Sequence, residues 1–226
     1  MKDRLADKLT PPTSDTAEKL YLTEEQLKQF VAVCEKQKLL WKLYMMVSLE
    51  TGARPEEVLG IWWPVINEKT REIKIMRTLQ YVDKKLIEGE PKNAASYRTV
   101  QVSKAVIDLL LAWKKKQLEY HIKLGAAWIN TEYVFTTECG IPMLPTTCST
   151  KAKKLFNEAK IEGVNLYTLR HTSVTRMLAS GIPVVNVAAY HGHSSAKMTL
   201  DVYGHAAEDY AKNCSAVMDF TQFKSN

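Results

Sequence analysis

The chain has 226 residues, 46% of them hydrophobic and 25% charged, with a formal net charge of +6 and four cysteines. These values fit one globular domain, or one domain with a tail, exclude a disordered or fibrous protein, and favour reduced thiols over a disulfide framework. No apolar run approaches the roughly 20 residues that a membrane helix needs, and residues 1–9 lack the apolar core of a secretory signal, so we expect a cytoplasmic protein with no membrane segment.

The first fifty residues predict an arm followed by helices. Residues 1–20 contain a Pro-Pro pair and no apolar period, so we interpret them as a linker or arm. Thr23 and Gln26 have capping-box spacing and predict a helix start, and a second, more apolar helix runs to Gly52, a good C-cap residue. Pro55, followed by two glutamates, is typical of the first turn of a third helix.

Between residues 72 and 102 the apolar period becomes that of short strands, and residues 88–93 are predicted as the turn between them. Ser103 is a cap for a long helix. Further helices are predicted at about 147–160, 168–179, 183–190, 195–203 and 206–219. The predicted fold class is mainly α with one small antiparallel β-sheet (α+β).

Positive charge is concentrated in the middle of the chain. Residues 84–123 carry a local charge of +5 and residues 151–176 one of +4, whereas residues 194–226 carry −1. Clustered positive charge suits a polyanion such as nucleic acid, because phosphate contacts release counterions. By itself it fits equally well the solvated face of a helix.

Four segments combine reactive side chains with turns or helix starts: residues 51–57 (TGARPEE), 91–98 (PKNAASYR), 167–172 (YTLRHT) and 191–195 (HGHSS), the last followed by Tyr203. Each alone has a structural explanation. Arg54 and Glu57 are spaced as a helical ion pair, Lys92 fits a solvated turn, and Tyr167 and Tyr203 fit core packing. The zinc-site interpretation of His191, His193 and His205 lacks a completing ligand, so we predict no metal.

Taken in order, the four segments resemble the catalytic domain of the tyrosine recombinases, the phage integrase family. The similarity covers residues 21–207 and is carried by TGARPEEVLGI, EPKNAASYRTV, YTLRHTSVTRMLASG and HGHSSAKMTLDVYGH. The P-K-x-x-x-S-x-R-T-V run is most similar to integrases of phages and integrative elements. The resemblance implies a site-specific DNA recombinase that cleaves and rejoins strands through a 3′-phosphotyrosine, integrating or excising a mobile element without a cofactor.

The resemblance also implies roles for individual residues. Tyr203 would be the nucleophile that attacks the phosphodiester, and Arg54 and Arg170 would clamp the non-bridging oxygens of the transition state. Lys92 would protonate the departing 5′-oxygen. His193 would donate a hydrogen bond to the phosphate or orient the nucleophile.

Two further positions qualify this assignment. Glu57 would hold Arg54 in position without itself contacting the phosphate. Tyr167 stands where the family commonly has histidine, and a phenol is a poorer base near neutral pH, so we expect Tyr167 to act as a hydrogen-bond donor. His171 is interpreted as structural. The group that deprotonates Tyr203 is left open.

Partners follow from the same resemblance. Double-stranded DNA would contact the candidate residues Tyr97, Arg98, Lys151, Lys153 and Lys154. We expect a nucleoid-associated protein that is a tetramer on two DNA sites and a monomer when free, with an excision factor as a further candidate partner. Residues 208–226 would form a tail that docks on a neighbouring protomer, or else folds back on their own domain. Family members usually carry a further N-terminal core-binding domain, so we interpret the chain as a catalytic domain without that half.

Two other functions compete with recombination. Residues 168–203 can be interpreted as a helix-turn-helix of a non-enzymatic DNA-binding module, which leaves Arg54, Lys92 and Tyr203 unexplained. A type IB topoisomerase-like nicking-closing enzyme would share the phosphotyrosine chemistry but would need no defined site. The sequence does not name the DNA target or the direction of the reaction.

Overall fold

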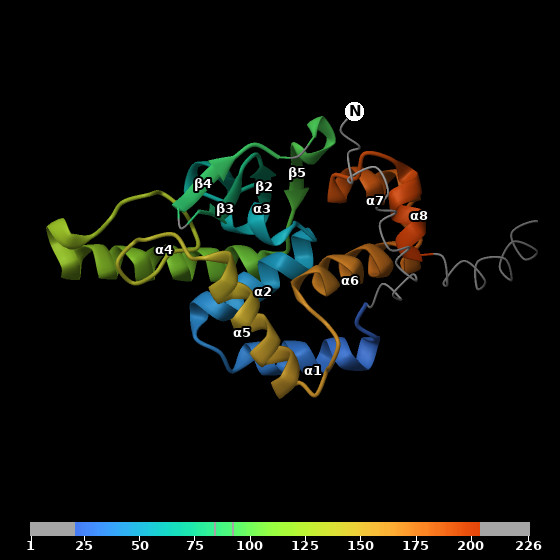
Figure 1. Ribbon diagram of the computed structural model, residues 1–226, viewed down its shortest axis with the longest axis horizontal. Coiled ribbons are helices and arrows are strands. Elements are labelled where there is room, and N and C mark those ends of the chain that lie inside the picture. The colour runs from blue at the N-terminus through green and yellow to red at the C-terminus, as the bar shows by residue number, and fades with distance from the viewer. Residues whose placement is uncertain (1–20, 84, 92, 204–226) are drawn as a thin grey trace, which may run out of the picture.

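The computed structural model describes residues 21–83, 85–91 and 93–203, with the backbone alone from residue 201. It is a mostly helical domain with antiparallel strands, as predicted, but the strands form two small sheets where the sequence predicted one. In Figure 1 the strands lie above α2 (Leu39–Thr51) and α4 (Lys104–Leu124), while α1 (Glu24–Glu35) and α5 (Pro145–Glu158) lie below them. None of the described helices is both long and apolar enough to cross a membrane. The predicted arm, tail and 206–219 helix lie outside the described residues.

The first three helices begin and end where local chemistry predicts. The Thr23 hydroxyl accepts a hydrogen bond from the Gln26 amide, and the Gln26 side chain accepts one from the Thr23 amide, which completes the capping box of α1. Helix α2 ends at Gly52, which adopts the left-handed conformation with φ 54°. Helix α3 (Pro55–Leu59) starts three residues later with proline in its first turn.

The strands form two sheets. Strands β1 (Ile66–Asn67), β2 (Glu72–Ile75) and β5 (Arg98–Gln101) pair in the order β1-β2-β5, and β3 (Thr78–Val82) pairs with β4 (Lys85–Gly89). The predicted turn at 88–93 is therefore wrong in part: Glu88 and Gly89 still pair with β3, and the last pair of this hairpin is Val82 with Lys85. Residue 92 lies in the connection from β4 to β5.

The remaining helices lie close to their predicted ranges. Ser103 caps α4, as predicted, by accepting a hydrogen bond from the Val106 amide. Helices α6 (Leu166–Ala179), α7 (Val184–His191) and α8 (Ala196–Tyr203) lie within two residues of the predicted ranges. Helix α5 starts at Pro145, two residues earlier than predicted, because proline suits its first turn.

Two apolar clusters hold these helices. The larger one joins α1, α2, α4 and α5, and in it the rings of Phe30 and Phe156 stack with centroids 4.6 Å apart. The smaller one, built from Val174, Leu178 and Val187, packs α7 on α6. Helix α2 contacts both α4 and α6, so Gly52 ends a helix that links the two.

Candidate active site

Arg54 stands at the junction between α2 and α3, directly before the first turn of α3. The Glu57 carboxylate accepts a hydrogen bond from the Arg54 amide at 3.0 Å and pairs with its Nη1 at 2.7 Å. Only 1% of the Glu57 side chain is exposed, against 21% for Arg54. Burial alone would raise the pKa of Glu57, but the guanidinium groups of Arg98 and Arg54 reverse that effect and hold its pKa below the ordinary value. Glu57 is therefore a carboxylate that fixes Arg54.

Arg98, at the start of β5, completes this ion-pair network. Its Nη2 donates to Glu57 Oε2 at 3.0 Å, its Nε to the Tyr190 carbonyl at 2.8 Å and its Nη1 to the Ser96 carbonyl at 3.0 Å. The side chain is 5% exposed. The expectation that Arg98 contacts DNA is therefore wrong, because its guanidinium is buried and bonded within the protein.

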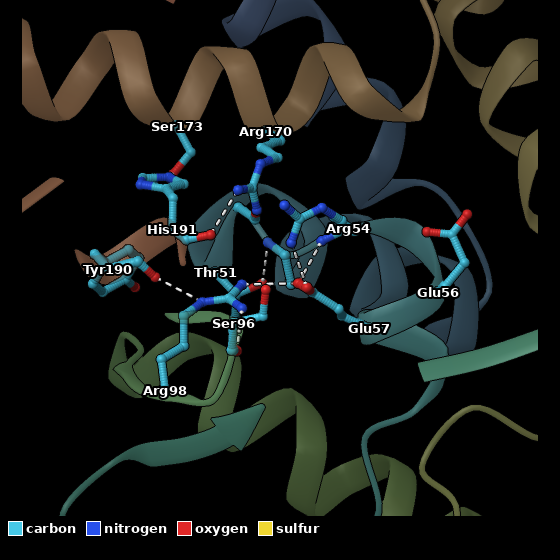
Figure 2. A network of polar contacts seen from close by, with 12 residues as sticks. Thr51, Arg54, Glu56, Glu57, Ser96, Arg98, Arg170, Ser173, Tyr190 and His191 are labelled. Carbon is cyan, nitrogen blue, oxygen red and sulfur yellow. Dashed lines mark hydrogen bonds and ion pairs between the residues drawn. The ribbon is translucent and has the colours of Figure 1, made fainter. Parts of the chain in front are cut away.

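Arg170 projects from the first turns of α6 toward Arg54, as Figure 2 shows. It is held by two main-chain oxygens: Nη1 donates to the Gly52 carbonyl at 2.7 Å and Nη2 to the His191 carbonyl at 2.6 Å. Burial, and then repulsion from Arg54 and Arg98, lowers the pKa of Arg170 to about 9. Arg170 therefore stays charged at neutral pH beside two other cations.

The two histidines of the HGHSS segment differ in their surroundings. His191 is fully buried, with Nδ1 beside the Val187 carbonyl at 2.9 Å and Nε2 beside Ser173 Oγ at 3.0 Å. His193 lies in the wall of a groove of about 720 Å³ between residues 95–99 and α7, with Nδ1 2.7 Å from Thr199 Oγ1. Burial, then repulsion from Arg170, Arg54 and Arg98, lowers the pKa of His193 to about 4. His193 is thus neutral at pH 7.

Tyr167 lies at the edge of this arrangement. Its side chain is 43% exposed, and its hydroxyl lies 3.4 Å from Glu56 Oε2. Partial burial and the Glu56 carboxylate raise the pKa of Tyr167, while Arg54 and Arg170 act in the opposite direction. At neutral pH the phenol therefore keeps its proton and can donate it in a hydrogen bond.

Lys92 and the side chain of Tyr203 lie outside the described part of the chain. Tyr203 is the last residue of α8, and α8 packs against both α7 and α6. The nucleophile candidate therefore ends a helix that packs on the helices carrying Arg170 and His191. Within the described residues no three histidine, cysteine or acidic side chains gather as a metal site.

The cluster has the electrostatics of an anion site. Three guanidinium groups, those of Arg54, Arg98 and Arg170, lie near the buried carboxylate of Glu57, and the neutral imidazole of His193 lies beside them. Arginine forks suit the oxygens of a phosphate, and donors fixed in advance stabilise charge that develops on them. The arrangement can therefore bind a phosphodiester and stabilise its transition state.

The family of this chain follows from comparison with known proteins. Residues 20–209 match the model of the phage integrase family. The chain belongs to that family. The ICEBs1 integrase of Bacillus subtilis (strain 168) is 28% identical over 195 residues, which cover 86% of this chain and 53% of the relative. The XerC-like tyrosine recombinase of Caldanaerobacter subterraneus subsp. tengcongensis is 28% identical over 208 residues, covering 87% and 53%.

Solved structures show the same fold for this phage integrase domain. The Tn1549 transposon integrase, in complex with transposon right end DNA, has a TM-score of 0.75 at 22% identity and covers 96% of this chain and 70% of that one. XerA recombinase has a TM-score of 0.69 at 18% identity, covering 86% and 65%. The chain spans about half the length of the curated relatives it matches.

The other DNA-contact candidates of this integrase domain are dispersed. Tyr97 is 42% exposed at the mouth of the His193 groove. Lys153 and Lys154 are exposed on α5. Lys151 is turned toward α1 and α2, with its amine 2.8 Å from Gln37 Oε1 and 5.8 Å from the Trp41 ring. Lys151 therefore does not join the arginine cluster.

Sequence reasoning missed the roles of Arg98, His191 and Gly52 in this site. A signal for Arg98 was present, because Arg98 and Val100 alternate on one face of β5 opposite the buried Ile75 and Ile73. That alternation points Arg98 inward. The carbonyls of Gly52 and His191 carry no comparable signal.

Proposed function

We propose that this phage integrase domain cleaves and rejoins DNA strands at specific sites, through a 3′-phosphotyrosine intermediate, to integrate or excise a mobile element. One observation carries the proposal. Arg54, Arg170 and His193 stand in three distant segments of the chain, yet Arg170 bonds the Gly52 carbonyl, two residues before Arg54, and the His191 carbonyl, two residues before His193. A purely structural role for three basic side chains would not require them to converge.

The arginines would act on the phosphate. The transition state carries extra negative charge on the non-bridging oxygens, and Arg54 and Arg170 would each donate to them. Because Arg170 is held by two carbonyls, its guanidinium is oriented before DNA arrives. His193 would assist as a neutral donor. If the Thr199 hydroxyl donates to Nδ1, the proton of the imidazole lies on Nε2 and is free to bond a phosphate oxygen.

The covalent step would use Tyr203 and Lys92. The Tyr203 phenol gives up its proton to water, and its oxygen forms a bond to phosphorus as the bond from phosphorus to the 5′-oxygen breaks; the Lys92 ammonium gives that departing oxygen a proton. Rejoining reverses the step, with a 5′-hydroxyl attacking the phosphotyrosine. Tyr167 would donate a hydrogen bond to the phosphate. No external energy source is needed because the phosphotyrosine ester conserves the bond.

Duplex DNA would be the substrate, and the relatives support this partner. The Tn1549 integrase and the XerH recombinase were both solved with DNA. On two DNA sites we propose a tetramer, with residues 208–226 docking on the neighbouring protomer and Tyr97, Lys153 and Lys154 near the backbone. An excision factor that biases the direction of the reaction, and association with the nucleoid, belong to the same proposal.

A covalent-capture experiment tests the proposal and identifies the DNA site at the same time. The chain is incubated with nicked duplexes that carry a random central segment, and DNA that remains attached to protein in detergent is recovered and sequenced. We expect attached DNA with an enriched sequence. Tyr203→Phe should form no adduct, whereas the matched Tyr81→Phe, an exposed tyrosine on β3, should retain it.

Two outcomes would contradict the proposal. If the wild-type chain forms no adduct, or if the adduct persists in Tyr203→Phe, the assigned chemistry is wrong. Attached DNA without sequence enrichment, together with relaxation of a supercoiled plasmid, would instead indicate a topoisomerase-like nicking-closing enzyme.

A further inference from the structure

Arg98 connects three separate segments of the chain. Each of its three guanidinium nitrogens bonds a different one: Glu57 in α3, the Tyr190 carbonyl at the end of α7, and the Ser96 carbonyl in the connection from β4 to β5. These contacts are 2.8 to 3.0 Å long. Figure 2 shows Arg98 between Glu57 and Tyr190. A planar fork with fixed donors is suited to such a triple contact.

Each of the three segments leads to a residue of the proposed reaction. Glu57 holds Arg54 through its other oxygen at 2.7 Å. Tyr190 precedes His191, whose carbonyl accepts from Arg170 at 2.6 Å. Ser96 lies in the same connection as residue 92. The Arg98 guanidinium thus bonds Glu57, which holds Arg54, and bonds the carbonyl of Tyr190, the residue before the His191 carbonyl that holds Arg170.

Gly192 shows how closely the HGHSS segment rests on this guanidinium. Gly192 has φ +65°, and a Cβ placed there would lie 3.0 Å from Arg98 Nη1 and 3.0 Å from the Ala95 carbonyl oxygen. A side chain at 192 would therefore fit only if Arg98 or the backbone at Ala95 and Ser96 shifted by a few tenths of an ångström. The turn that carries His193 is seated directly on Arg98.

We propose that Arg98 is a positioning residue for DNA strand cleavage, joining the segments of Arg54, Arg170 and His193 and the β4–β5 connection into one rigid site. The inference rests on the proposed recombinase function. It assigns Arg98 no contact with DNA. Its effect should therefore appear in the rate of the chemical step and not in DNA affinity.

The first test measures single-turnover cleavage at saturating DNA, using a duplex recovered by the covalent capture. Arg98→Met should slow cleavage roughly 10²-fold, the order expected when reacting groups are misplaced by about 1 Å. Affinity and its salt dependence should stay at wild-type values. Loss of a phosphate contact would instead weaken DNA binding and reduce the slope of log binding constant against log salt concentration by about 1. The matched control Lys74→Met, an exposed cation on the adjacent strand β2, should behave as wild type.

The second test is the pH profile of cleavage, which a purely structural role would not move. The groups facing Glu57 are Arg54 from the junction before α3, Arg98 from β5 and Arg170 from α6, with neutral His193 beside them. Without Arg98, the buried Glu57 carboxylate loses its strongest counter-charge, so its pKa rises. As the solution is acidified, cleavage by Arg98→Met should therefore begin to fall at a higher pH than cleavage by wild type. In the double variant Arg98→Met/Glu57→Gln no carboxylate titrates at position 57, so this earlier fall in cleavage rate on acidification should be absent.

Arg98→Lys serves as the conservative variant and as the fallback if Arg98→Met does not fold. An ammonium keeps the charge beside Glu57 but cannot span the three acceptors that the planar guanidinium reaches. The pH at which cleavage begins to fall should therefore return to the wild-type value, while the cleavage rate recovers only in part. The inference is overturned if folded Arg98→Met cleaves at the wild-type rate, if affinity falls instead of rate, or if rate falls with an unchanged pH profile. A wild-type chain that forms no adduct overturns the proposed function and this inference together; a normal wild-type adduct with any of the other outcomes overturns the inference alone.

Discussion

Replacing Gly52 by alanine tests the packing at the centre of the site. Gly52 has φ +54°, and a Cβ there would lie 2.4 Å from His191 Cδ2 and 2.5 Å from its Nε2. The His191 ring is fully buried and has contacts at both nitrogens, to the Val187 carbonyl and Ser173 Oγ. The ring therefore has to move by about 1 Å to reach an ordinary contact distance, breaking at least one of these contacts.

Two costs add up in Gly52→Ala. Left-handed backbone at alanine costs about 1–2 kcal/mol, and forcing atoms into a packed core typically costs about 1–3 kcal/mol. We expect a loss of about 2–5 kcal/mol, a large share of the roughly 5–15 kcal/mol by which a domain is stable. At about 2–4 °C per kcal/mol for this size, Tm should fall by about 4–20 °C.

Gly181→Ala is the matched control. Gly181 has φ +79°, yet nothing lies within 4 Å of its added Cβ, so it reports the backbone cost alone. Urea unfolding of both variants gives the difference that is due to His191. Removing the ring should relieve the clash, so Gly52→Ala/His191→Ala should be more stable than additivity predicts by at least about 1 kcal/mol. Equal losses for Gly52→Ala and Gly181→Ala would refute the steric argument.

Three further outcomes follow from contacts in the site and the core. Arg170→Lys should reduce adduct formation by about 10²–10³-fold at saturating DNA, because an ammonium cannot bond both carbonyls and a phosphate oxygen; an unchanged rate would remove Arg170 from the site. Phe30→Ala should lower the free energy of unfolding by about 3–5 kcal/mol in urea, whereas Leu118→Ala, at a position 56% exposed, should change it by less than about 0.5 kcal/mol. Burial, with repulsion from nearby arginines, lowers the pKa of His191 from 6.5 to about 3, so the unfolded chain binds the proton first. Stability should therefore fall as pH drops from 6.5 toward 3, by up to about 1.4 kcal/mol per pH unit for this group, and urea titrations of His191→Gln should show a flatter slope.

Local chemistry made most of the helices predictable from sequence. The capping box at Thr23, the left-handed Gly52 and the Ser103 cap depend on neighbours within four residues, and all three are confirmed. The β3–β4 hairpin was misplaced because β4 is mostly exposed and has no clean alternation. Its end is set by pairing between Thr78 and Gly89, which no local signal reports.

In the site, too, contacts between near neighbours in the sequence were predictable and contacts between distant residues were not. The contact of Arg54 with Glu57 spans three positions of one helix start, so its spacing predicts it. Arg98 meets the Tyr190 carbonyl across 92 positions, and Arg170 meets the Gly52 carbonyl across 118. Any residue type offers a carbonyl, so such partners leave no trace in the pattern of side chains. Tertiary packing alone reveals them.

The support of Arg170 by main-chain oxygens bears on how this domain tolerates substitution. No point mutation deletes a backbone acceptor, so the two bonds that orient Arg170 survive almost any exchange at positions 52 and 191 that leaves the chain path intact. Substitutions disturb Arg170 when they displace the backbone that carries these two carbonyls. A mutational scan should find its sensitive positions at Gly52 and Gly192, where an added side chain meets a neighbouring segment, and at Ser173, which contacts the His191 ring.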